Sequence, residues 1–329
     1  MTSPRTAELY DPDAAVAFYE DRYAKGYMAD WPRPKKQRVF EFVRSLGLPA
    51  SGRALDFGCG NGVFTEVVRQ ALGPGWTIVG SEISHVAIEN ARGRFPECRF
   101  LHGEDPALAA EPFDFFFTHH VLEHVYDLPE VLGQLDRLMK PEARGVHIMP
   151  CGNEGSYLHG LALLRTDGIN AAMGNRFFYD EEGHVRRLRT DDLAAEYRRL
   201  GYDLAAERYC AHKWGFYDWL TELGPERVRE TLDPSRAVDD AARQRLTLLR
   251  RRSLALWFLR HQAPMVEEKL AKANRSLRDY ALLLLGLPFY PLSKPIDTWL
   301  RRAPERDWAE RGTDRRAGEM FLAFRRPAR

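Results

Sequence analysis

Short apolar segments alternate with amphipathic ones through the first two-thirds of the chain. The apolar segments end near residues 57, 82, 101, 118 and 150, and each is bounded by glycine, proline or charged residues. Continuous apolar runs of this length are typical of strands that are covered on both faces. The alternation therefore predicts an α/β fold with a doubly wound, mostly parallel sheet.

Further elements complete this pattern. Helices are expected at 13–25, 35–45, from 122 to about 140, and at 190–200, and strands at 145–150, 203–209 and 318–324. Gly201 follows the last of these helices at the position where a glycine commonly ends a helix. Two long segments, 151–189 and 212–313, lie outside the alternation and are expected to be insertions.

Residues 55–65, Leu-Asp-Phe-Gly-Cys-Gly-Asn-Gly-Val-Phe-Thr, predict a strand that runs into a glycine loop and then a helix. Such a loop presents backbone amides and the positive end of a helix dipole to a ligand. Val63 stands where a dinucleotide fingerprint has its third glycine, and the loop has no P-loop lysine. Asp56 precedes the first glycine and would repel a pyrophosphate but could pair with a cation. The loop therefore favours a cationic nucleoside over a dinucleotide.

These residues carry a resemblance. Leu55 to Gly62 resembles the first motif of class I S-adenosylmethionine-dependent methyltransferases, and the order of the later segments is similar to that family through about residue 152. The resemblance implies S-adenosylmethionine as cofactor, S-adenosylhomocysteine as product, and a seven-stranded sheet whose last strand is antiparallel. It also implies an N-terminal helical cap over the cofactor and a large, mainly helical insertion before the last strand.

The resemblance assigns the cofactor site residue by residue. Glu82 ends the second strand, where the family's acid binds the ribose hydroxyls, and residues 103–105 lie where the family places an acid or amide near the adenine. Tyr23 and Arg33 are weaker candidates for the methionine carboxylate. The expected cofactor-binding residues are Tyr23, Arg33, Asp56, Gly58, Cys59, Gly60, Gly62, Glu82, Ile83, Gly103, Glu104, Asp105, Thr118 and His119.

Methyl transfer requires alignment of the acceptor and, for a hydroxyl or carbon acid, removal of its proton. Histidine is the natural base near neutral pH. His119 and His120 follow the fourth strand at the sheet edge where ligands bind in open α/β sheets, and His124 comes shortly after them. The catalytic candidates are therefore these three histidines, although packing at the sheet edge explains each of them singly about as well.

The segment from His120 to His124 also matches the inverted zinc-protease signature His-x-x-Glu-His. That signature requires a continuous helix, whereas here the segment follows a strand, so a protease is disfavoured. Some ubiquinone-pathway O-methyltransferases resemble this region and bind a metal through Glu-x-x-Glu-His, but His120 replaces the first glutamate. No metal ligands are assigned.

Residues 280–293 contain no charged side chain. A buried lid helix or a homodimer contact is the favoured interpretation, and an apolar wall for a lipid-like substrate or a peripheral membrane contact is the alternative. The expected organisation is a helical cap at 1–50, a cofactor-binding core at 51–211 with a substrate-side insertion at 151–189, a helical lid at 212–313, and a last strand and tail at 314–329.

The composition disfavours several kinds of partner and cellular location. The net charge of +1 disfavours a nucleic-acid partner, and the four cysteines form no Cys-x-x-Cys pair, which favours a reducing compartment. The first residues have no apolar core typical of a signal peptide, and no apolar run reaches membrane-spanning length, so a cytoplasmic location is expected.

The predicted function is methylation of a hydroxyl on a small molecule, sugar or lipid-linked metabolite, as in secondary metabolism, with a histidine assisting deprotonation. Methylation of nitrogen or carbon, and a non-catalytic binding scaffold, are the alternatives. A nicotinamide dehydrogenase is disfavoured by Val63 and Asp56.

Overall fold

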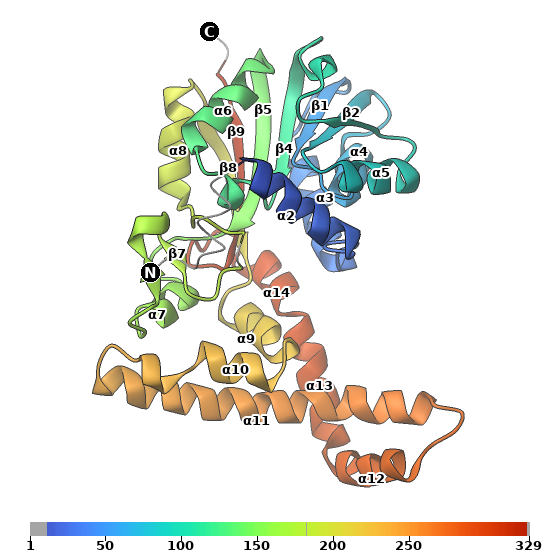
Figure 1. Cartoon of the computed structure of the whole chain (residues 1–329), viewed down its shortest axis with the longest axis vertical. Coiled ribbons are helices and arrows are strands. Elements are labelled where there is room, and N and C mark those ends of the chain that lie inside the picture. The colour runs from blue at the N-terminus through green and yellow to red at the C-terminus, as the bar shows by residue number, and fades with distance from the viewer. Residues whose placement is uncertain (1–11, 182, 328–329) are drawn as a thin grey trace.

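The computed structural model describes residues 12–181 and 183–327, and its centre is one seven-stranded sheet (Figure 1). The strands follow the order β3-β2-β1-β4-β5-β9-β8. Their bounds are β1 Gly52–Phe57, β2 Trp76–Glu82, β3 Arg99–His102, β4 Phe113–His119, β5 Met139–Pro150, β8 Asp203–Cys210 and β9 Glu319–Arg325. Only β9 is antiparallel to its neighbours, so the predicted mostly parallel sheet with an antiparallel last strand is confirmed.

Helices cover both faces of the sheet. On one face α3 (Arg33–Ser45), α4 (Val63–Leu72) and α5 (His85–Arg94) pack on side chains such as Phe115 and Phe117. On the other face α6 (Leu128–Arg137) and α8 (Thr190–Arg199) pack on Phe113 and Phe116. Neighbouring residues of a strand point to opposite faces, so Phe116 faces one helical layer while Phe115 and Phe117 face the other. The doubly wound architecture is confirmed.

The strand order reverses between β1 and β4, because β1 pairs with β2 on one side and with β4 on the other. In open α/β sheets the ligand crevice lies outside the carboxyl ends of the strands at such a reversal. Helix α2 (Pro12–Ala24) packs against α5 near this edge, and it provides the helical cap.

Two boundaries differ from the prediction. Residues 122–124 form one 3₁₀ turn, and the long helix begins only at Leu128, because Asp127 caps it by accepting a hydrogen bond from the Glu130 amide at 3.0 Å. The fifth strand begins at Met139, six residues before the predicted start at Gly145, because Met139 already pairs with Phe113.

The first insertion contains α7 (Tyr157–Ala162) and a small hairpin of β6 (Ile169–Asn170) and β7 (Arg176–Phe177). The second is helical, as predicted, and extends away from the sheet (Figure 1). Its helices are α9 Lys213–Glu222, α10 Pro225–Thr231, α11 Asp240–Ala271, α12 Leu277–Gly286, α13 Tyr290–Arg301 and α14 Ala303–Glu310. Short 3₁₀ turns lie at Pro106–Leu108 (η1), Ala171–Met173 (η3), Pro234–Arg236 (η4) and Leu287–Phe289 (η5).

A buried ion cluster holds the helical module together. Arg260 on α11, 1% exposed, is 2.8 Å from Asp218 on α9 and 3.0 Å from Asp297 on α13. The predicted stretch 280–293 lies at the far end of this module and is largely exposed, so the expectation of a buried lid helix is wrong for these residues. Within the described ranges, no helix is both long and apolar enough to cross a membrane.

Candidate functional site

The loop between β1 and α4 adopts a backbone shape that favours glycine. Gly58, Gly60 and Gly62 have φ angles of +74°, +51° and +76°. A Cβ atom at Gly58 would lie 2.5 Å from the Val121 side chain, and one at Gly60 would lie 2.8 Å from the Tyr23 hydroxyl. Both the left-handed conformation and the close approach of neighbours therefore exclude larger residues.

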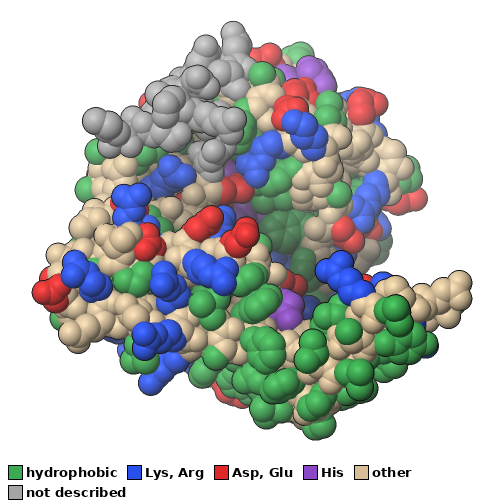
Figure 2. Space-filling model, turned by 60° about the horizontal axis from the view of Figure 1, so that its bottom comes forward, with side chains coloured by type: hydrophobic (Ala, Val, Ile, Leu, Met, Phe, Trp, Pro, Cys, Tyr) green, Lys and Arg blue, Asp and Glu red, His purple; other side chains and the backbone are tan. Residues whose placement is uncertain are grey.

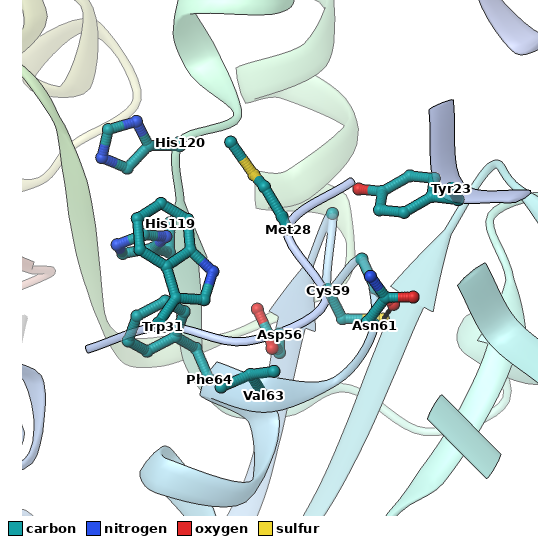
Figure 3. A pocket seen from close by; sticks show the side chains of 12 residues that line it. Tyr23, Met28, Trp31, Asp56, Cys59, Asn61, Val63, Phe64, His119 and His120 are labelled. Carbon is teal, nitrogen blue, oxygen red and sulfur yellow. Dashed lines mark hydrogen bonds between the residues drawn. The ribbon is translucent and has the colours of Figure 1, made fainter. Parts of the chain in front are cut away.

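Asp56 lies at the end of β1 in the wall of the cavity (Figure 3). The carboxyl is 1% exposed, and the Thr65 hydroxyl donates a hydrogen bond to it at 2.6 Å. Burial raises the pKa of Asp56 to about 7, the Thr65 hydrogen bond opposes this rise, and the negative charge of Glu82 adds to it. A cationic ligand would therefore favour the ionised form.

Glu82 closes the opposite side of the glycine loop. Its carboxylate accepts hydrogen bonds from the amides of Gly60 at 3.0 Å, Ile83 at 2.8 Å and Ser84 at 3.2 Å. Burial raises the pKa of Glu82, and these three amides act against the rise. The strand end thus holds an oriented carboxylate beside the loop, which is the placement expected for an acid that binds ribose hydroxyls.

A small cavity of about 50 Å³ lies between the glycine loop, the end of β4 and the N-terminal segment (Figure 3). It is lined by Tyr23, Met28, Trp31, Asp56, Gly58, Cys59, Gly60, Asn61, Val63, Phe64, His119 and His120. Ligand pockets usually measure roughly 300–1,000 Å³. Residues 23–31 must therefore move outward before a ligand as large as a nucleoside can enter.

Tyr19 and Tyr23 on α2, together with Tyr27 just after it, hold this covering segment in place. The Tyr19 hydroxyl lies 2.8 Å from Nδ1 of His124, and Tyr23 contacts the glycine loop. The Tyr27 hydroxyl donates a hydrogen bond to Glu181 at 2.8 Å, and Arg22 donates one to the same carboxylate at 2.9 Å. Residues 19–31, which we call the cover, are thus fastened to the first insertion as well as to the sheet edge.

His119 forms one wall of the cavity. Its ring stacks on Phe64 with centroids 3.8 Å apart and meets the Trp31 ring edge-on at 4.9 Å. Within the described residues, its Nε2 atom has no hydrogen-bond partner. Burial, together with the positive charges of Lys35 and His120, holds the pKa of His119 well below its ordinary value. The ring is therefore neutral at pH 7.

His120 is held in an ion network instead. Its Nδ1 lies 2.9 Å from Glu123, and its Nε2 lies 3.1 Å from Glu319. The Lys35 ammonium is 3.1 Å from the same Nε2 and 2.5 Å from Glu319. Burial and Lys35 lower the pKa of His120, but the two carboxylates raise it above its ordinary value overall. Both ring nitrogens are engaged.

Among the residues that the structure describes, two groups of side chains have the spacing to hold a metal ion. One comprises His119, His120 and Glu319, and the other Glu123, His124 and His184; in each, the ligand atoms lie within 4.8 Å of one another. In the first group, Lys35 already supplies a cation to Glu319. In the second group, burial raises the pKa of Glu123, but His120 and the neighbouring histidines lower it, to about 2 overall. The Glu123 carboxylate is therefore paired with His120.

The remaining predicted residues lie around the cavity without lining it. Thr118 is buried, and its hydroxyl lies 2.6 Å from Nδ1 of His147 on the neighbouring strand β5. Arg33 is exposed at the start of α3. Gly103, Glu104 and Asp105 follow β3, where Asp105 accepts a hydrogen bond from the Ala107 amide at 2.9 Å. Gly62 begins α4, and Ile83 is 40% exposed after β2. Their ligand-binding roles stay predictions.

Several residues of the site escaped the sequence reasoning. Trp31 and Phe64 enclose His119, Asn61 donates a hydrogen bond to the Tyr27 carbonyl at 2.9 Å, and Lys35 and Glu319 hold His120. Phe64 stands two residues after the last loop glycine, which is a usable signal. Glu319 lies 199 residues from His120 in the chain, and no local pattern connects them.

Comparison with known proteins gives one family match. The model of a family described as "Methyltransferase domain" matches residues 27–207, which is more than half of the chain. The match covers the glycine loop, both acidic strand ends and the histidines after β4.

Individual relatives match over shorter ranges. The Nocamycin O-methyltransferase of Saccharothrix syringae is 30% identical over 44% of this chain and 48% of its own length. The ubiquinone biosynthesis O-methyltransferase of Rhodopseudomonas palustris is 34% identical over 39% of this chain and 50% of its own length. The bifunctional biotin biosynthesis protein BioCD of Bordetella avium is 31% identical over 40% of this chain and 29% of its own length. The chain therefore spans half or less of the length of these curated relatives.

Proposed function

Because the chain belongs to the methyltransferase domain family and takes S-adenosylmethionine as its cofactor, we propose that it methylates a hydroxyl group of a small molecule, sugar or lipid-linked metabolite. Two of the relatives are named O-methyltransferases, one of nocamycin and one of ubiquinone biosynthesis. This favours oxygen as the acceptor atom and, through the nocamycin relative, a role in secondary metabolism. Methylation of nitrogen or carbon is the alternative within the family.

The observation that carries the proposal is that the Nε2 atom of His119, a residue that lines the cavity, has no hydrogen-bond partner among the described residues. A buried nitrogen without a partner is costly unless a ligand pairs with it. In the proposed reaction, the acceptor oxygen forms a bond to the methyl carbon, the carbon–sulfur bond breaks, and S-adenosylhomocysteine leaves. The proton of the hydroxyl passes to Nε2 of His119.

The other two histidines have different roles in this proposal. His120 orients the end of β4 through Glu123 and Glu319, and it is a positioning residue. His124 anchors the cover through Tyr19. Because the pKa of His119 is held low, its ring is a weak base, and it takes the proton only as the new bond forms.

The test begins with calorimetric binding of S-adenosylmethionine to the wild-type chain and to Glu82→Ala. Wild-type binding that weakens at least tenfold in Glu82→Ala supports the cofactor site. Methyl transfer to a panel of hydroxyl-, amine- and carbon-acid acceptors is then followed by mass spectrometry, with His119→Asn beside the wild type.

Under the proposal, the hydroxyl compounds are methylated, and His119→Asn lowers kcat at least a hundredfold while the cofactor Kd changes little. Products methylated only at nitrogen or carbon would overturn the O-methyltransferase assignment. Cofactor binding without transfer to any acceptor would favour a binding scaffold.

A further inference from the structure

Helix α12 turns its apolar side outward. Leu277, Leu284 and Leu285 are 90%, 75% and 68% exposed, whereas the side that packs on α11 contributes Leu283 and the small residue Gly286. A surface helix usually buries its apolar stripe and exposes its polar one. The arrangement here is the reverse, so these leucines are available to something outside the described chain.

The exposed apolar residues continue beyond α12 onto the next two elements. We call this set the outer apolar face: Leu277, Tyr280, Leu284, Leu285, Phe289 and Leu292, all between 39% and 90% exposed. Figure 2 shows hydrophobic side chains gathered over the part of the molecule formed by the helical module. Contiguous apolar surface of this kind is typical of protein-binding or membrane-binding sites.

The charges around this face are predominantly positive. The acids nearby are neutralised within the chain: Asp279 pairs with Lys272 at 2.9 Å, and Glu267 pairs with Lys294 at 2.5 Å. By contrast, Arg278 and Arg302 are exposed, and neither has an ion-pair partner among residues 12–181 and 183–327. Basic side chains without counter-charges favour an anionic surface.

A groove beside the outer apolar face has the same character. It has a volume of about 610 Å³ and lies between Lys294, Pro295, Thr298, Trp299, Arg302 and Arg306 on α13 and α14. The Arg306 guanidinium lies 4.1 Å from the centre of the Trp299 ring. Lys294 is paired with Glu267, so the groove offers an aromatic ring and the two guanidinium groups of Arg302 and Arg306, which suits a phosphate group attached to an apolar chain.

We propose that the outer apolar face docks on a bilayer that contains anionic lipids, with α12 lying in the membrane interface and Arg302 and Arg306 near lipid phosphates. A helix of ten residues is about 15 Å long, half of the roughly 30 Å hydrocarbon core, so it lies on the membrane and does not span it. The exposed rings of Tyr280 and Trp299 suit the headgroup region.

Charge argues for this occupant over a second copy of the chain. If two outer apolar faces met, Arg278 of both copies, which lies on α12 beside the exposed leucines, would enter the interface with no exposed acid of the face to neutralise it. An anionic bilayer supplies the missing negative charge over a wide area. The inference goes beyond the proposed reaction and does not depend on it.

The test is co-sedimentation of the full chain with vesicles of phosphatidylcholine alone and of phosphatidylcholine with 30% phosphatidylglycerol. The expected result is binding to the anionic vesicles at least tenfold tighter than to the neutral ones, and weaker binding as salt is raised. The double variant Leu284→Glu, Leu285→Glu should lose at least tenfold, and Arg278→Glu with Arg302→Glu should lose a similar amount together with most of the salt dependence.

The matched control is Leu163→Glu with Leu223→Glu, because these leucines are 56% and 51% exposed but lie outside the outer apolar face. Circular dichroism and unchanged cofactor binding verify that each variant folds. The proposal is overturned if the wild type ignores anionic vesicles, or if the control variant loses as much binding. It is also overturned if ultracentrifugation finds a dimer that the Leu284/Leu285 variant dissociates while vesicle binding is absent.

Discussion

The buried carboxyl of Asp56 makes a prediction about stability and pH. Its pKa is about 7 in the folded chain against 3.8 for an ordinary aspartate. Because the folded value is the higher one, the folded chain holds more protons than the unfolded chain between these two pH values. The contribution of Asp56 to the free energy of unfolding is therefore fully present below about pH 4 and is lost as the pH rises toward 7.

The size of the effect follows from the two pKa values. Raising the pKa from 3.8 to about 7 corresponds to roughly 4 kcal/mol, because one pKa unit equals about 1.4 kcal/mol. Roughly 3 kcal/mol of this is lost between pH 5 and pH 8. Asp56→Asn keeps a side chain of the same shape that can still accept a hydrogen bond from Thr65, but it cannot ionise. The variant should therefore escape this loss.

The assay is urea unfolding of the wild type and Asp56→Asn at pH 5, 6, 7 and 8. The difference in unfolding free energy should shift by roughly 3 kcal/mol in favour of the variant between pH 5 and 8. Titrating groups that do not interact with Asp56 contribute equally to both proteins and cancel. Glu66→Gln is the control: the pKa of Glu66 is lowered by its hydrogen bonds from Arg69, so its difference from wild type should stay constant over this range.

The reasoning is refuted if the curves of the wild type and Asp56→Asn run parallel from pH 5 to 8. A second arm uses the ligand: S-adenosylmethionine carries positive charge, so its binding to the wild type should tighten between pH 6 and 8, and Asp56→Asn should lose this dependence. If ligand affinity in both proteins responds to pH in the same way, Asp56 does not face the cation.

Three further predictions concern the glycine loop, the cover and metal dependence. Gly58→Ala should weaken cofactor binding at least tenfold, because its Cβ would lie 2.5 Å from Val121 at a φ of +74°; Gly93→Ala, whose Cβ meets nothing within 4 Å, is the calorimetric control. Glu181→Gln should lower the cofactor Kd up to about fivefold, roughly 1 kcal/mol, because its ion pair with Arg22 holds the cover over a cavity too small for the ligand; an unchanged Kd would mean that the cover is held elsewhere. Incubation with a chelator should leave methyl transfer intact, because Lys35 and His120 already neutralise the carboxylates; activity restored only by added metal would contradict this.

How much of the site could be predicted depended on distance along the chain. The glycine loop, Asp56 and Glu82 were predictable because short segments carry them: a strand end followed by glycines, and an acid at the end of the next strand. The parallel pairing of β1 with β2 brings these strand ends to the same edge. Local pattern and sheet geometry are sufficient for this half of the site.

The histidines required information that no local pattern contains. His119 and His120 are neighbours in sequence, yet within the described residues one has an unpartnered ring nitrogen and the other has both nitrogens engaged. The difference arises because His120 adopts a φ of +55°, which turns its ring toward Lys35 and Glu319. Glu319 reaches this position only because β9 inserts beside β5, a pairing between segments far apart in the chain.

The same limit applied to residues 280–293, whose composition favoured a buried lid helix or a dimer contact but is also compatible with a membrane-facing helix. What separates the two is the direction of each side chain. Asp279 and Leu283 lie on one side of α12 and face the module, while Leu277 and Leu284 lie on the other and face outward. Composition predicts how apolar a segment is, and only packing decides which side remains for a partner. The outward leucines therefore make the strongest case for a function beyond the cofactor site.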